Sequence, residues 1–147
     1  MSRLAREPKF LKSLRSLGRL CPEIDAVYLF GSRAAGRSGP LSDVDIGVLL
    51  DMNRVRSRDL LRTRFHLITQ AMAACGRSNV DLVLLNEAGP LLAYEVIHDG
   101  KLAYERDHQR RVSYEAAALR RYFDFQPFFY TARRYLKKHL REGTYGG

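Results

Sequence analysis

The chain has 147 residues, of which 46% are hydrophobic and 28% are charged, and its formal net charge is +9. This composition excludes a disordered tail, a collagen-like fibre and a disulfide-rich scaffold, because the apolar content is ordinary and only two cysteines are present. A globular chain of this length buries roughly 70% of its unfolded surface, so one compact unit is expected.

The first predicted element is a helix near the N-terminus. Its apolar residues recur at helical spacing: Phe10, Leu11, Leu14 and Leu17. Gly18 follows them and is predicted to end the helix. The arginine-rich start superficially matches a mitochondrial transit peptide, but the apolar stripe favours an ordinary packed helix.

Three short runs of strand-forming residues follow. They cover residues 24–30, 44–50 and 80–85. Each is almost continuously apolar, which is typical of strands that are covered on both faces. The first run ends abruptly at Gly31, so a sharp turn is expected there.

A helix is predicted between the second and third strands. Its apolar stripe recurs at i, i+4, i+7 and i+11 and consists of Leu61, Phe65, Ile68 and Met72. Gly76 follows as a C-terminal glycine. Gly89 and Pro90 open a shorter helix over residues 91–99 that ends at Gly100, and residues 101–104 are predicted to form an edge strand.

A long helix is predicted from Asp107 onward. Its first apolar stripe consists of Val112, Ala116, Leu119 and Phe123. Pro127 is expected to kink or break the helix, because proline lacks the N–H that a helix interior needs. The helix then resumes through Leu136 and Leu140.

The residues that can carry chemistry concentrate between the first two strands. Gly31 and Ser32 follow the first strand, and Asp43 and Asp45 begin the second. Residues two apart on a strand point to the same face, so the two carboxylates repel each other unless a cation lies between them. Oxygen ligands without a nearby His or Cys favour Mg²⁺ over Zn²⁺. The N–H groups after Gly31, with the Ser32 hydroxyl, can cradle phosphate oxygens.

Asp81 adds a third carboxylate at the start of the third strand. It interrupts an apolar segment, where a buried and unpaired charge would be costly. If the third strand neighbours the second, Asp81 joins Asp43 and Asp45 in an acidic cluster. Such a cluster can hold two metal ions, the arrangement that serves in-line phosphoryl or nucleotidyl displacement.

Each piece of this pattern also has an ordinary structural interpretation. Asp43 could cap a turn, Asp45 could pair with Arg33 or Arg37, and Asp81 could face water at a sheet edge. A glycine–serine turn after a strand is common. The pieces together, at this spacing, favour the functional interpretation.

The complete pattern resembles a known family. Gly31-Ser32, ten further residues, Asp43-Val44-Asp45 and the later Asp81 resemble the signature of the DNA-polymerase-β-type nucleotidyltransferase superfamily. The short length and the segments GSRAAGRSGPLSDVDIGVLL and LLAYEVIHDGKLAYERD resemble the minimal nucleotidyltransferases, the MNT-domain (MntA-type) antitoxins paired with HEPN toxins. The resemblance reaches from the N-terminal helix to about Phe125. It implies an α/β (α+β) nucleotidyltransferase fold, a small mixed β-sheet flanked by helices with a C-terminal helical extension.

The resemblance also implies a reaction. Members of this family use ATP and Mg²⁺ to transfer AMP to a tyrosine of the toxin, which silences its ribonuclease activity. By this resemblance Asp43 and Asp45 would bind both metal ions, and Asp81 would bind the ion nearest the acceptor and help to deprotonate its hydroxyl. The nucleotide-binding residues would be Gly31, Ser32, Arg33 and Ser42.

The basic excess lies at the two ends of the chain. Residues 1–20 carry 6 basic and 1 acidic side chains, and residues 101–147 carry 11 and 5, whereas residues 21–100 carry 8 and 10. This distribution favours a docking surface for a protein partner, here a HEPN-domain toxin, over direct nucleic-acid binding. Basic residues at helical spacing, interleaved with aromatic ones, make the candidate surface: Arg134, Lys137, Lys138 and Arg141, with Phe128, Phe129, Tyr130 and Tyr135. A solvated helix face with its aromatics in the core, and a contact with RNA phosphates, are the alternatives.

Two other functions stay open. A small-molecule or RNA nucleotidyltransferase, similar to aminoglycoside adenylyltransferases, shares the motif but needs an acceptor pocket within the chain. An antitoxin that acts by binding alone would not need the carboxylates. Little of the chain remains after residue 86, so we expect a macromolecular acceptor that brings its own binding surface.

The remaining expectations concern organisation and location. Residues 1–105 are expected to form the minimal nucleotidyltransferase domain with its N-terminal helix, and residues 106–147 a basic, aromatic helical extension of the same globular unit. No apolar run approaches the length of a membrane span. Cys21 and Cys75 lack metal-ligand spacing and are expected to be reduced thiols of a cytoplasmic protein. His66 and His98 are expected to be surface or core residues rather than catalysts.

Overall fold

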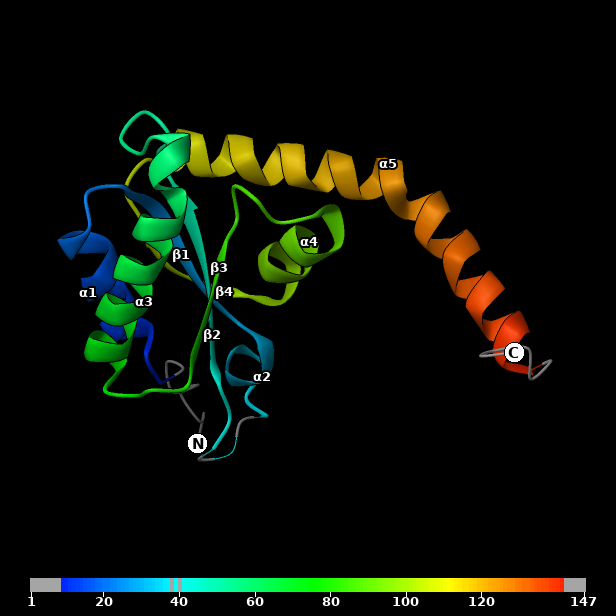
Figure 1. The fold of residues 1–147 in the computed structure, drawn as a ribbon, viewed down its shortest axis with the longest axis horizontal. Coiled ribbons are helices and arrows are strands. Elements are labelled where there is room, and N and C mark those ends of the chain that lie inside the picture. The colour runs from blue at the N-terminus through cyan, green and yellow to red at the C-terminus, as the bar shows by residue number, and fades with distance from the viewer. Residues whose placement is uncertain (1–8, 38, 40, 142–147) are drawn as a thin grey trace, which may run out of the picture.

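A four-stranded mixed sheet forms the centre of the molecule in a computed structural model that describes residues 9–37, 39 and 41–141. The strand order is β3-β2-β1-β4 (Figure 1). The strands are β1 (Ile24–Phe30), β2 (Val44–Leu50), β3 (Val80–Leu84) and β4 (Lys101–Glu105). β1 pairs antiparallel with β2 and β4, and β2 pairs parallel with β3. The predicted strands and the edge position of the last one are confirmed.

Helices cover both faces of this sheet. One face carries α1 (Leu11–Leu20) and α3 (Leu60–Cys75), and the other carries α4 (Pro90–Asp99) and the first part of α5 (His108–Arg141) (Figure 1). Two short elements complete the chain, α2 (Gly31–Ala34) and η1 (Ser57–Asp59). Val27 and Leu29 pack in the core of the first face, whereas Ala26 and Tyr28 pack in that of the second. The almost continuous apolar runs therefore reflect burial on both faces, as predicted.

Gly18 does not end the N-terminal helix, so that prediction is wrong. α1 continues to Leu20, and Gly18 is buried within it. A Cβ atom at Gly18 would lie 2.1 Å from Cδ1 of Tyr104 on β4. The glycine is needed for the close approach of helix and strand rather than for termination. The stripe predicted for this helix is buried: Phe10, Leu11, Leu14 and Leu17.

The stripe predicted for α3 is partly wrong. Leu61 and Phe65 are 66% and 61% exposed, whereas Leu67 and Ala71 are buried. Apolar residues occur on more than one side of this helix, so spacing alone does not identify the packed face. Gly76 ends the helix in the left-handed conformation, as predicted.

The stripe predicted for α5 is also wrong: Ala118 is the buried residue of this helix, and Tyr114 combines apolar packing with a polar contact. Val112 and Phe123 are exposed. The Tyr114 hydroxyl instead donates to the Leu85 carbonyl at 2.8 Å, and the Tyr28 hydroxyl donates to Oε1 of Glu115 at 2.6 Å. The packed side of the helix therefore carries Tyr114 and Glu115.

The second half of α5 leaves the sheet. Pro127 lies inside one continuous helix, so a break is excluded, and Figure 1 shows the helix bending away from the body of the molecule. Phe128, Tyr130 and Tyr135 are all at least 60% exposed, so these aromatics are not in the core. Among the helices that the structure describes, none combines the length and the apolar character needed to cross a membrane.

Candidate functional site

The turn from β1 into α2 brings backbone directly against a carboxylate. Phe30 pairs with Asp45 across the β1–β2 ladder, and Gly31 then takes a φ of +70°. A Cβ atom at Gly31 would lie 2.1 Å from Oδ2 of Asp45. Only glycine satisfies both the left-handed backbone and this approach.

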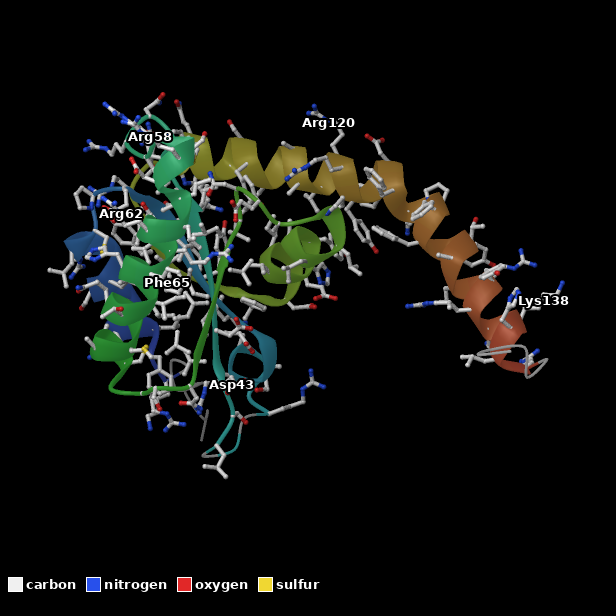
Figure 2. The ribbon with its side chains drawn as sticks, in the orientation of Figure 1. Asp43, Arg58, Arg62, Phe65, Arg120 and Lys138 are labelled. Carbon is white, nitrogen blue, oxygen red and sulfur yellow. The ribbon has the colours of Figure 1, made fainter. Side chains whose placement is uncertain are left out.

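The three predicted acidic residues meet at this end of the sheet. Asp45 and Asp81 are Cα partners in the parallel register of β2 and β3, so their carboxylates lie on adjacent strands and the same face. Asp43 lies two residues before Asp45, in the segment that leads into β2, and Figure 2 shows it close to α2. Asp43 and Asp81 are exposed, whereas Asp45 is half-buried. The cluster is therefore open to solvent on one side.

The electrostatics of the cluster favour a bound cation. Burial raises the pKa of Asp45, the charges of Asp81 and Asp43 raise it further, and the Arg33 guanidinium opposes the shift. A divalent cation between the carboxylates would remove this repulsion. The donor set consists of carboxylate oxygens, which fits Mg²⁺.

Arg33 supports the loop that carries Asp43. It is 8% exposed, and its Nη2 donates to the Ser42 carbonyl at 2.7 Å and to the Gly39 carbonyl at 3.4 Å. Its guanidinium also lies 5.0 Å from the centre of the Phe10 ring. These contacts hold the loop in place. Among the described contacts Arg33 makes no hydrogen bond to Asp45, so its effect on the Asp45 pKa comes from its charge. Its assignment to nucleotide binding stays a prediction.

Asn79 is a further support that the sequence pattern did not reveal. Its Nδ2 donates to the Ser42 carbonyl at 2.9 Å, and its own carbonyl accepts the Val44 N–H at 2.9 Å. The only signal for it is its place just before the strand that carries Asp81. Asn79 therefore joins the loop before Asp43 to the start of β3.

The two predicted nucleotide-binding serines differ in their surroundings. Ser32 lies on α2, whose first-turn N–H groups have no acceptor within the helix. The Ser42 hydroxyl accepts the Gly39 N–H at 2.9 Å and so closes the turn before Asp43. Ser42, rather than Asp43, is the residue that caps this turn.

Comparison with known sequences supports a relation to nucleotidyltransferases. Residues 12–109 match the family described as polymerase beta, nucleotidyltransferase. The chain is 36% identical over 97 residues to the protein adenylyltransferase MntA of Shewanella oneidensis. That alignment covers 65% of this chain and 62% of the relative, so the chain spans less than two thirds of the relative's length.

Comparison with solved structures agrees on the fold. A chain in a crystal structure of a toxin–antitoxin with AMP-PNP matches with a TM-score of 0.67 and 25% identity, over 89% of this chain and 98% of that one. A chain in a structure of the tri-AMPylated Shewanella oneidensis HEPN toxin with its MNT antitoxin matches with a TM-score of 0.61 and 23% identity, over 89% and 95%. The second likeness, at its lower identity, concerns the fold alone.

Proposed function

Because the chain belongs to the polymerase β nucleotidyltransferase family, we propose that it transfers AMP from ATP to a tyrosine hydroxyl of a HEPN-domain ribonuclease toxin and thereby neutralises it. The observation that carries this proposal is the pairing of Asp45 with Asp81 beside Gly31. It gathers acidic residues and exposed backbone N–H groups at one open end of the sheet. The similarity to the adenylyltransferase MntA and to toxin–antitoxin chains supports the choice of substrate and partner.

The proposal gives a role to each residue of the site. Gly31 lets the backbone approach the phosphates, and the N–H groups of the following turn and the Ser32 hydroxyl bind phosphate oxygens. Asp43, Asp45 and Asp81 would hold Mg²⁺, most simply as two ions, which neutralises the charge on the reacting phosphate oxygens. Arg33 and Asn79 position the loop by donating hydrogen bonds to the Ser42 carbonyl. Arg33 and Ser42 would also help to bind the nucleotide.

The transfer step balances as follows. The tyrosine oxygen forms a bond to the α-phosphorus of ATP, and the bond from that phosphorus to the α,β-bridging oxygen breaks. Pyrophosphate leaves, and Asp81 accepts the phenolic proton and passes it to water. Asp81 is exposed on an edge strand, so an incoming acceptor can reach it from outside.

We further infer that the partner docks on the basic arm, residues 128–141 of α5. The arm carries five basic and no acidic side chains, and Figure 2 shows Lys138 far from the sheet. The arm itself forms much of a groove of about 700 Å³, whose mainly apolar lining includes Leu91, Phe129 and Leu136. An acidic partner with an apolar helix face fits this surface better than nucleic acid does, because the charged backbone of a nucleic acid would not fill the apolar groove.

Polar contacts between the start of α5 and the sheet support the expected organisation of the chain. Arg110 on α5 lies 2.8 Å from Oδ1 of the buried Asp25, and Tyr114 and Glu115 anchor the next turn. We therefore propose that residues 1–105 form the minimal catalytic domain and that residues 106–147 extend it within one unit.

Intact-mass measurement of the partner tests the proposed function. Purified HEPN protein from the same genome would be incubated with this chain, ATP and Mg²⁺. We expect the partner to gain the mass of one or more AMP units, and the gain to fall by about 10³-fold in rate for Asp43→Asn, which removes a metal ligand without disturbing the core.

The matched control is Asp99→Asn, which removes an exposed carboxylate at the end of α4. It should modify the partner at the wild-type rate. A partner that binds tightly but never gains mass would favour neutralisation by binding alone. Transfer to a small acceptor and not to the protein would favour the aminoglycoside-type alternative.

A further inference from the structure

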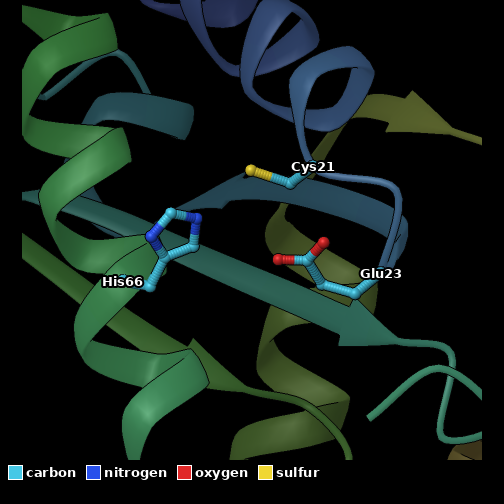
Figure 3. Close-up of side chains that lie close together, drawn as sticks. All are labelled: Cys21, Glu23 and His66. Atoms are coloured by element: carbon cyan, nitrogen blue, oxygen red, sulfur yellow. The ribbon is translucent and has the colours of Figure 1, made fainter.

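Three side chains of different chemistry converge at the other end of β1. Cys21 follows α1, Glu23 lies in the connection to β1, and His66 lies on α3. A sulfur, a carboxylate oxygen and a ring nitrogen of these residues all lie within 4.8 Å of one another. Figure 3 shows the three side chains pointing toward one space between α3 and the start of β1.

This group is separate from the acidic cluster. Cys21 and Glu23 precede the first residue of β1, whereas Gly31 follows its last residue. A seven-residue strand spans about 20 Å at roughly 3.3 Å per residue. Ligands of the acidic cluster therefore do not reach Cys21.

The backbone around Cys21 is already fixed. Its N–H donates to the Leu17 carbonyl at 3.2 Å, and its carbonyl accepts the Ile24 N–H at 3.1 Å and Nη2 of Arg106 at 3.3 Å. Cys21 is buried, Glu23 is half-buried and His66 is exposed. An ion bound here would thus have one rigid ligand and two that can adjust.

The spacing and chemistry suit a borderline-soft ion. Zinc binds sulfur at about 2.3 Å and imidazole nitrogen at about 2.0–2.1 Å, so ligand atoms around one ion lie about 3.5 Å apart. The three atoms lie within 4.8 Å of one another, so reaching that spacing would require only small shifts of the His66 and Glu23 side chains. A thiolate and an imidazole exclude Mg²⁺, which prefers oxygen ligands.

The charge of the three ligands suits one divalent ion. A metal ion would displace the thiol proton and offset the repulsion between thiolate and carboxylate. The three ligands would then carry two negative charges, which one divalent ion neutralises.

We propose that Cys21, Glu23 and His66 bind one Zn²⁺ ion with a fourth position open to water. Binding releases the Cys21 proton to solvent. The ion joins α3 to the connection between α1 and β1, so it stabilises the packing of both helices on one face of the sheet. Sequence spacing gave no sign of this site, because His66 is far from the other two ligands in the chain.

Cobalt and zinc titrations of the untagged, metal-free chain test the proposal. Co²⁺ should produce a thiolate-to-cobalt charge-transfer band that Zn²⁺ abolishes at one ion per chain. Zn²⁺ should also raise the melting temperature. His66→Asn alters an exposed residue and should leave the fold intact. The affinity of this variant for Zn²⁺ should fall by about 100-fold, because losing even a residue that only hydrogen-bonds to a metal ligand lowers metal affinity by up to about that factor.

Two variants serve as matched controls. His98→Asn changes another exposed helical histidine, and Cys75→Ser changes the other free thiol. Both should bind Zn²⁺ like the wild type, whereas Cys21→Ser should lose the charge-transfer band. A wild-type chain without that band, or equal Zn²⁺ affinity in His66→Asn and His98→Asn, would overturn the proposal.

Discussion

The acidic end of the sheet and the basic arm are built in opposite ways. At the acidic end, strand pairing sets Asp45 beside Asp81, and backbone approaches them through Gly31. In the basic arm, residues 128–141, aromatic side chains such as Phe128 and Tyr130 are exposed by more than 60%. One region is complete within the chain, whereas the other presents a surface that nothing in the described chain covers. Under the proposed function, the chain itself supplies the reacting groups, and the exposed arm binds the protein that accepts AMP.

After the loss of the Asp43 carboxylate, the next largest effect is expected from closing the space that Gly31 leaves. In Gly31→Ala the new Cβ must displace the Asp45 carboxylate, and the left-handed φ becomes strained. We expect AMP transfer to fall by about 100-fold or more, since misplacing a reacting group by about 1 Å costs that much. The free energy of unfolding should fall by about 1–3 kcal/mol.

Steady-state transfer rates and thermal melts would measure both effects. Gly36→Ala is the matched control, because Gly36 also has a positive φ but meets no atom within 4 Å. It should lose stability without losing transfer at saturating substrate. Equal activity in the two variants would show that the approach to Asp45 is unimportant.

A smaller effect is expected from reversing charge on the basic arm. Arg134→Glu with Lys137→Glu should raise the KM for the protein acceptor by about 10-fold or more and leave kcat unchanged, because both residues lie on the second half of α5, which bends away from the sheet (Figure 1). The effect should shrink at high salt. Arg58→Glu with Arg62→Glu, on η1 and α3, provides a control of equal charge change. If kcat fell instead, the arm would belong to the chemistry and the contrast between the two regions would fail.

The smallest effect concerns stability. The pKa of Asp45 is raised in the folded chain, so its ionised form opposes folding when no cation is bound. That penalty is fully present above the folded pKa and disappears as the pH falls through it. Asp45→Asn should therefore melt at a higher temperature than the wild type at about pH 7 with chelator, and the difference should shrink at about pH 4.

Thermal melts at both pH values, with and without Mg²⁺, would measure this. Mg²⁺ should stabilise the wild type more than the variant, because the variant lacks a ligand. A variant that melts below the wild type at neutral pH would show that Asp45 contributes to the fold rather than opposing it.

The strands could be located from the sequence because they are short-range signals, whereas the acidic cluster depended on the third strand lying beside the second, as the parallel pairing of β2 and β3 shows. Val44 and Ile46 alternate with Asp45 within one strand, and a glycine after a strand marks a turn. The faces of α3 and α5 were mispredicted because apolar spacing does not say which apolar residue packs. Tyr114 and Glu115 orient α5 through polar contacts with residues distant in the sequence. Asn79 was not predicted for the same reason, because the Ser42 carbonyl that it contacts is also distant in the sequence.

The proposed function requires that the chain neutralises its partner by a covalent transfer at the acidic cluster. The most direct measurement separates the HEPN partner from this chain after incubation with ATP and Mg²⁺, and then assays the partner's ribonuclease activity and intact mass. We expect that partner recovered from the wild-type chain stays inactive and carries AMP, whereas partner recovered from Asp43→Asn is unmodified and active. Partner that regains activity, unmodified, after separation from the wild-type chain would contradict it.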